Sequence, residues 1–148
     1  MDEDRARYNA LYDLLLATAE KVSDRRAQAN TYLLSVNSAI VGLHGYLQEG
    51  KASVGAGGKQ VWLWAIPAAG IVVCFAWATL LASYRQLNRA KFSVLMEMEA
   101  ELPLKPFTRE RQIYKSARRL PLSWIESAVP WGFILLYAAM IAATLLKP

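Results

Sequence analysis

Two long stretches of the chain, residues 61–84 and 127–146, are apolar and contain no charged side chain. Each has twenty residues or more, which as an α-helix is enough to cross the ~30 Å hydrocarbon layer of a membrane. A soluble chain of 148 residues would rarely contain two such stretches. The pattern therefore predicts a multi-pass membrane protein, whose polar groups must find partners without water inside the bilayer.

A third stretch, residues 30–48, is apolar on one side and polar on the other. We predict that it also crosses the membrane, because without it the crossing at 61–84 would reverse its direction and conflict with the distribution of basic residues. Residues 4–29 before it are predicted as a cytoplasmic amphipathic helix, and residues 49–60 after it as a glycine-rich external loop.

The two polar segments, 4–29 and 85–126, both carry hydrophobic side chains at every third or fourth position, which places them on one helix face. These stripes are Tyr8, Tyr12, Leu15, Ala19 and Val22 in the first segment, and Leu87, Ala90, Val94, Met98 and Leu102 in the second. We expect that the two stripes pack against each other as a helical stalk, or that each meets another subunit.

Beyond the second stripe the chain turns at Pro103 and Pro106, because proline cannot continue a helix. The alternating carboxylates Glu97, Glu99 and Glu101 are predicted to face water. Thr108 is expected to cap a short basic helix over residues 109–120.

Basic residues are distributed unevenly around the three apolar segments. Fourteen lysines and arginines lie before residue 30 or between residues 84 and 127, whereas only Lys51, Lys59 and Lys147 lie elsewhere. Cytoplasmic segments of membrane proteins carry such an excess. The predicted fold is therefore an all-α membrane protein with three transmembrane helices, the N-terminus inside and the C-terminus outside, and a cytoplasmic helical stalk. The same distribution accounts for the net charge of +5 without a nucleic-acid partner.

The polar side of segment 30–48 is the strongest functional lead. At 100° per residue, Asn30, Asn37 and His44 fall within about 40° of one another, and Ser35 and Ser38 continue the polar arc. One interpretation is that these residues hydrogen-bond between helices. The other is that they line a water-filled pathway in an oligomer. His44 is expected to act as a hydrogen-bonding residue, since a single histidine without acidic or cysteine neighbours is poor evidence for a metal.

Two further sets of residues suggest contacts with helices and lipids. Gly70, Cys74 and Ala78 follow one another at four-residue intervals, which is typical of a close-packing helix face. The basic residues of the segment 109–119 suit either anionic lipid headgroups or a solvated loop. They are Arg109, Arg111, Lys115, Arg118 and Arg119.

The sequence contains no constellation that predicts catalysis. There is no Ser/His/Asp set and no cluster of histidines or cysteines with metal-ligand spacing, and Cys74 is the only cysteine. We therefore expect no enzymatic activity and no cofactor or bound metal.

Three short signatures together resemble a known type of membrane protein. They are Arg25-Arg26-Ala27-Gln28-Ala29-Asn30, then Ser83-Tyr84-Arg85-Gln86-Leu87-Asn88-Arg89-Ala90-Lys91-Phe92, then Glu97-Met98-Glu99-Ala100-Glu101-Leu102-Pro103. In layout the chain is similar to the SLATT superfamily, two-span bacterial effectors found beside antiphage genes. The resemblance covers roughly residues 5–107, and the additional segment 127–146 departs from the two-span pattern.

The resemblance implies an oligomeric effector that compromises the bacterial inner membrane when infection is sensed. Because the chain has no sensing domain, its trigger would be a cytosolic partner protein. The alternative, from another functional class, is a non-catalytic scaffold that anchors a cytosolic partner at the membrane. The expected partners are thus membrane lipids, further copies of the chain and a cytosolic protein.

Overall fold

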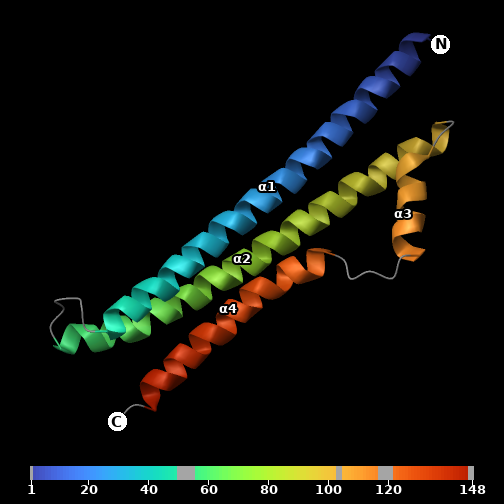
Figure 1. Cartoon of the computed structure of the whole chain (residues 1–148). Helices are drawn as coiled ribbons and strands as arrows, with labels where there is room; N and C mark the ends of the chain where they lie inside the picture. The colour runs from blue at the N-terminus through green and yellow to red at the C-terminus, as the bar shows by residue number, and fades with distance from the viewer. Residues whose placement is uncertain (1, 50–55, 103–104, 117–121, 147–148) are drawn as a thin grey trace. The chain divides into compact units, whose positions relative to one another are not determined.

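The computed structural model describes residues 2–49, 56–102, 105–116 and 122–146. These residues form four α-helices and one short 3-10 helix (Figure 1). In chain order they are α1 (Asp2–Gln48), α2 (Ala56–Met98), η1 (Glu99–Glu101), α3 (Pro106–Ser116) and α4 (Leu122–Leu145). The described part of the chain contains no β-strand, so the predicted all-α class is confirmed.

Two helical segments are long and apolar enough to cross a membrane by length and composition, Gly58–Glu101 and Ile125–Leu145. They contain the two charge-free stretches of the sequence. The segment 30–48, which lies in α1, does not meet the same criterion. Its asparagine, serine and histidine side chains lower its hydropathy, and the third crossing stays a prediction.

The chain divides into two compact units. Unit 1 contains Met1–Gln28 and Ala82–Ser123, and unit 2 contains Ala29–Leu81 and Trp124–Pro148. Unit 2 is built from parts of α1, α2 and α4, with α4 lying along the N-terminal half of α2 (Figure 1). Its core is mostly apolar, and the buried hydrophobic side chains include Leu47, Ile66, Trp77, Leu81 and Tyr137.

In unit 1, α1 and α2 pack through a mixture of apolar and polar contacts. Ala19, Val22 and Leu95 are buried. Asn88 Nδ2 donates to Ser23 Oγ at 3.3 Å, and Lys91 Nζ donates to Thr18 Oγ1 at 2.8 Å. The face of α2 that meets α1 therefore includes two polar residues beside Leu95.

This contact differs from the first of the two alternatives for the stripe on α2, in which it packs against the stripe on α1. Leu87 and Val94, two of its members, are 47% and 42% exposed. The other alternative, that the stripe meets another subunit, stays a prediction. The face that packs lies one residue further along the helix, at Asn88, Lys91 and Leu95. Hydrophobic periodicity does not detect this face because hydrogen bonds of Asn88 and Lys91, as well as apolar side chains, make the contact.

The start of α3 also differs from the prediction. Glu99 is fully buried, so the expectation that it faces water is wrong. Its carboxylate accepts hydrogen bonds from Phe107 N at 2.7 Å, Thr108 N at 3.0 Å and Thr108 Oγ1 at 2.9 Å. Pro106, the first helical residue, has no N–H to satisfy. Glu99 therefore caps α3, and Thr108 lies within the first turn instead of serving as the cap.

The environment of Glu99 favours its charged form. Burial raises its pKa, but the two backbone N–H groups and the Thr108 hydroxyl stabilise the carboxylate, as does the side chain of Tyr12. The net result is a pKa below the ordinary value for this side chain. A negative charge is also stabilised at a helix N-terminus by the helix dipole. Phe107 completes the attachment of α3, with its ring 5.7 Å from that of Phe92 and 6.4 Å from that of Tyr12.

Candidate functional site

Asn37 is the centre of a buried polar cluster in unit 2. The side chain is completely buried, and its Nδ2 donates to Leu33 O of the preceding helical turn at 2.8 Å. Its Oδ1 accepts from Cys74 Sγ at 3.1 Å and lies 3.0 Å from Tyr137 Oη. The same Tyr137 hydroxyl lies 3.2 Å from Asn37 O, so its one proton is shared between two acceptors. One amide on α1 thus contacts both α2 and α4.

Gly70 allows Tyr137 to reach this cluster. A Cβ atom at Gly70 would overlap the aromatic ring of Tyr137. Of the predicted close-packing set, Gly70 and Cys74 are buried and Ala78 is half-buried. The absence of a side chain at Gly70 therefore has a specific partner, the ring on α4.

Asn30 and His44 make separate contacts on the same helix. Trp77 Nε1 donates to Asn30 Oδ1 at 3.1 Å, and the ring of this buried tryptophan lies 6.2 Å from that of Phe133. His44 is buried and lies 2.9 Å from Gln48 Nε2 through its Nε2. Its Nδ1 is buried and has no hydrogen-bond partner in the part of the chain that the structure describes. The structure therefore points Asn30, Asn37 and His44 into unit 2.

Ser35 and Ser38 lie on a different side of α1, where they are exposed. Each donates to its own helix, Ser35 Oγ to Thr31 O at 3.0 Å and Ser38 Oγ to Leu34 O at 2.9 Å. These two serines belong to a row of exposed small residues with spacings of four and three, which we call the small-residue face. Its members are Thr31, Ser35, Ser38, Gly42 and Gly45.

The small-residue face has room above it. Apart from the adjacent residues and the backbone of α1 itself, no atom of the described residues lies within 4 Å of the place where a Cβ would stand on Gly42 or on Gly45. The polar arc predicted from the sequence therefore has two parts. The part with Asn30, Asn37 and His44 makes contacts within the chain, and the small-residue face is open to a neighbouring molecule.

The partners Trp77 and Tyr137 were missed by sequence reasoning. Their signal was present, because a buried Trp N–H or Tyr hydroxyl in an apolar segment needs a hydrogen-bond partner. The sequence does not give the rotation of each helix about its own axis. That rotation decides which polar group the tryptophan or tyrosine side chain contacts.

The predicted basic set is only partly covered by the structure. Arg109 and Arg111 are exposed on α3, and Arg111 lines a cavity of unit 1. Lys115 belongs to α3, but its side chain is outside the described residues, as are Arg118 and Arg119. Among the described residues, no group of three or more His, Cys, Asp or Glu side chains is arranged to hold a metal ion.

Residues 9–146 match the octameric membrane protein family (8xMP), which is nearly the whole chain and includes every helix of the polar cluster. The chain belongs to this family. Together with the two apolar helices, this membership makes it a small oligomeric membrane protein. No curated protein and no solved structure matches the chain.

Membership of the octameric membrane protein family refines the resemblance drawn from the sequence. The expectation of a small membrane protein that assembles from copies of itself is confirmed. The family found is not the SLATT superfamily, and the match gives no support for an antiphage role, a pore or a cytosolic partner.

Proposed function

We propose that the protein is a homo-oligomeric, non-enzymatic membrane assembly that permeabilises the membrane along a polar pathway. The copies meet, and the pathway forms, at the small-residue face of α1. Each chain crosses three times, with its N-terminus in the cytoplasm and its C-terminus outside. The bacterial inner membrane, the antiphage role and the cytosolic trigger are included in the proposal on the resemblance to SLATT-type effectors alone.

The observation that carries this proposal is the division of the polar arc on α1. Asn37 has both functional atoms of its amide engaged within its own chain, so it is not available to a second copy. The small-residue face is exposed, polar and without bulk. In membranes, small residues let two helix backbones approach closely. Ser35 and Ser38 donate their protons to their own helix, but each hydroxyl oxygen can still accept a hydrogen bond across the contact.

The third crossing is supported by the same geometry. Segment 30–48 is only moderately apolar because of residues such as Asn37 and His44. Both are buried inside unit 2, at 0% and 2% exposure. A polar group shielded by neighbouring helices does not meet lipid, so its cost of insertion is much reduced. The family name supports an assembly of several copies, and we take eight as the proposed number.

A depolarisation experiment tests the pathway. We expect inducible expression of the native chain in a bacterium to lower the membrane potential and admit a dye. The variant Gly42→Leu places a bulky side chain on the small-residue face and should abolish both effects. Ala39→Leu is the matched control, since Ala39 is exposed on the same helix about 80° from the middle of that face.

Equal depolarisation by all three chains would show that the pathway does not use this face. If the native chain forms oligomers in detergent but never depolarises cells that contain its trigger, permeabilisation is wrong. The assembly would then serve a different purpose.

The second candidate is a scaffold that anchors a cytosolic partner. It is favoured by exposed apolar side chains in unit 1, a surface that a partner protein would cover. They are Leu11, Leu14, Leu87, Val94 and Ile113. A partner isolated in fixed ratio with the native chain, lost with Leu11→Ser and Leu14→Ser, and unaccompanied by leakage would favour this function over the first.

A further inference from the structure

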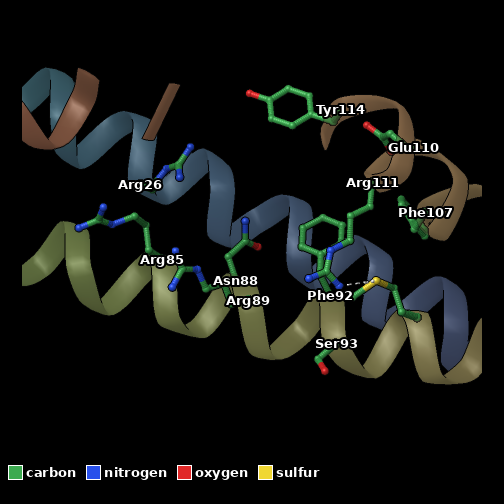
Figure 2. Close-up of a pocket in the computed structure, with 11 residues that line it drawn as sticks. Arg26, Arg85, Asn88, Arg89, Phe92, Ser93, Phe107, Glu110, Arg111 and Tyr114 are labelled. Carbon is green, nitrogen blue, oxygen red and sulfur yellow. Dashed lines mark hydrogen bonds between the residues drawn. The ribbon is translucent and has the colours of Figure 1, made fainter. Parts of the chain in front are cut away.

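Unit 1 contains a cavity of about 740 Å³ that the proposed function does not use. Figure 2 shows that three helices surround it, with Arg26 from α1, Arg85 to Ser93 from α2, and Phe107 to Tyr114 from α3. The volume is within the range of about 300–1,000 Å³ that holds small-molecule ligands in proteins. It is therefore large enough for a ligand bigger than a simple ion.

The lining of this cavity is strongly basic. Four arginines contribute to it: Arg26, Arg85, Arg89 and Arg111. Glu110 is the one carboxylate among the lining residues. Guanidinium groups present several N–H donors in a planar fork, which matches the oxygens of phosphate better than a lysine does. Arginines from three different helices that surround one space favour an anion with several oxygens.

The rest of the lining is apolar or aromatic. Phe92 and Phe107 pack edge to face at 5.7 Å, and Tyr114 lies on the rim beside Glu110 (Figure 2). Arg111 Nη1 reaches from α3 to Met96 Sδ at 3.5 Å, drawn as the dashed line in Figure 2. A thioether sulfur is a weak acceptor, so an anionic oxygen would be a better partner for this guanidinium.

Asn88 also belongs to the lining. Its Nδ2 donates to Ser23, whereas its Oδ1 is buried and accepts no hydrogen bond within the described residues. The groups that remain for a ligand are therefore the arginines and the aromatic rings. The lining thus matches a ligand with two parts: an anion and an apolar or planar portion.

We infer that this cavity is a binding site for a phosphate ester. The arginines hold the phosphate oxygens, and the aromatic rings contact the remainder of the ligand. This chemistry has two sources, an anionic phospholipid headgroup or a soluble phosphate ester. Arg85 directly follows the charge-free stretch 61–84, and Arg26 lies four positions before the first residue of segment 30–48. At the end of a crossing, both would be at the level of lipid headgroups.

The test measures binding to the full-length protein in neutral detergent. The probes are phosphatidylglycerol, phosphatidylcholine with the same acyl chains, and ATP as a soluble phosphate ester with a planar group. The cavity variant combines Arg89→Gln with Arg111→Gln. The control combines Arg7→Gln with Arg109→Gln, which removes the same charge from exposed residues of unit 1 outside the lining. Circular dichroism and the melting temperature verify that both variants keep their fold.

We expect the native chain to bind phosphatidylglycerol, ATP or both. The cavity variant should lose at least about tenfold in affinity, and the control less than about twofold. Binding of phosphatidylglycerol alone identifies a lipid site, and binding of ATP alone identifies a soluble ligand. Equal losses in the two variants, equal binding of phosphatidylcholine and phosphatidylglycerol, or no binding of either anion would each overturn the inference.

Discussion

Units 1 and 2 both bury polar side chains, but they provide partners for them in different ways. In unit 2, the single amide of Asn37 receives donors from two other helices, through Cys74 and Tyr137. In unit 1, the contacts Asn88–Ser23 and Lys91–Thr18 are separate pairs, each partly open to solvent. A lost pair in unit 1 can be replaced by water, whereas a donor without its acceptor in an apolar core has no substitute.

The difference indicates where the chain is sensitive to substitution. Loss of Asn37 in unit 2 removes a partner from three helices at once. Loss of Asn88 or Lys91 in unit 1 affects one contact between α1 and α2.

Gly70→Ala should destabilise unit 2 most. The new methyl group overlaps the ring of Tyr137, so the ring must move away from Asn37. Overpacking of this kind costs about 1–3 kcal/mol, and the hydrogen bonds to Asn37 are lost in addition. The measurement is the melting temperature in detergent.

Gly132→Ala on α4 is the matched control. Apart from the adjacent residues and the backbone of α4 itself, no described atom lies within 4 Å of its added Cβ, and alanine is a better helix former than glycine by up to ~1 kcal/mol. We expect it to be neutral or stabilising. The same loss in both variants would show that Tyr137 does not occupy the space above Gly70.

Asn37→Leu should have the next largest effect. It leaves the donors of Cys74 and Tyr137 without their side-chain acceptor, at a cost of about 1–2 kcal/mol. Since Tyr137 also reaches a backbone carbonyl, part of its bonding survives. Tyr137→Phe in the Asn37→Leu background should then cost less than in the native chain, which a double-mutant cycle measures. Additive losses would contradict the shared hydrogen bond.

Glu99 in unit 1 predicts a smaller, pH-dependent effect. Its pKa is lower in the folded chain than in the unfolded chain. The carboxylate therefore stabilises the attachment of α3 above its ordinary pKa, and this stabilisation is lost as the pH falls through the lowered, folded pKa. Hydrogen exchange at the amides of Phe107 and Thr108, corrected for the intrinsic rate, should show that the start of α3 detaches more often in acid than at neutral pH.

Glu99→Gln should weaken protection at these amides at neutral pH and remove its dependence on acid. Glu97→Gln changes an exposed carboxylate two residues away and should leave the native profile intact. If Glu97→Gln had the same effect as Glu99→Gln, the cap on α3 would not depend on this carboxylate.

The sequence allowed the helices, and the shared face of three polar residues on α1, to be predicted. Charge-free length identified two apolar helices, and the seven-residue spacing of Asn30, Asn37 and His44 placed them together. Whether that face meets other helices of the same chain or a pathway in an oligomer was left open. The position of Glu99 could not be predicted in this way. Its burial depends on α3 returning to it, which is a tertiary contact that alternating carboxylates do not indicate.

The face of α2 in unit 1 gives the same lesson. Leu87 and Val94 have the regular spacing of a core stripe, yet Asn88 and Lys91 make the contact with α1. A periodic search ranks positions by hydrophobicity, so it cannot find a contact in which two polar side chains bond to a serine and a threonine. Pairing of this kind becomes visible only when the two helices are placed side by side.

The buried thiol of Cys74 gives the chain an internal reporter. It is the only cysteine, it is fully enclosed, and its hydrogen is directed to Asn37. A bulky maleimide cannot reach it until the helices of unit 2 separate. The rate at which the native chain is labelled therefore measures the rate of that separation directly. A cysteine introduced on the surface would react at once, which lets probes be attached without replacing Cys74.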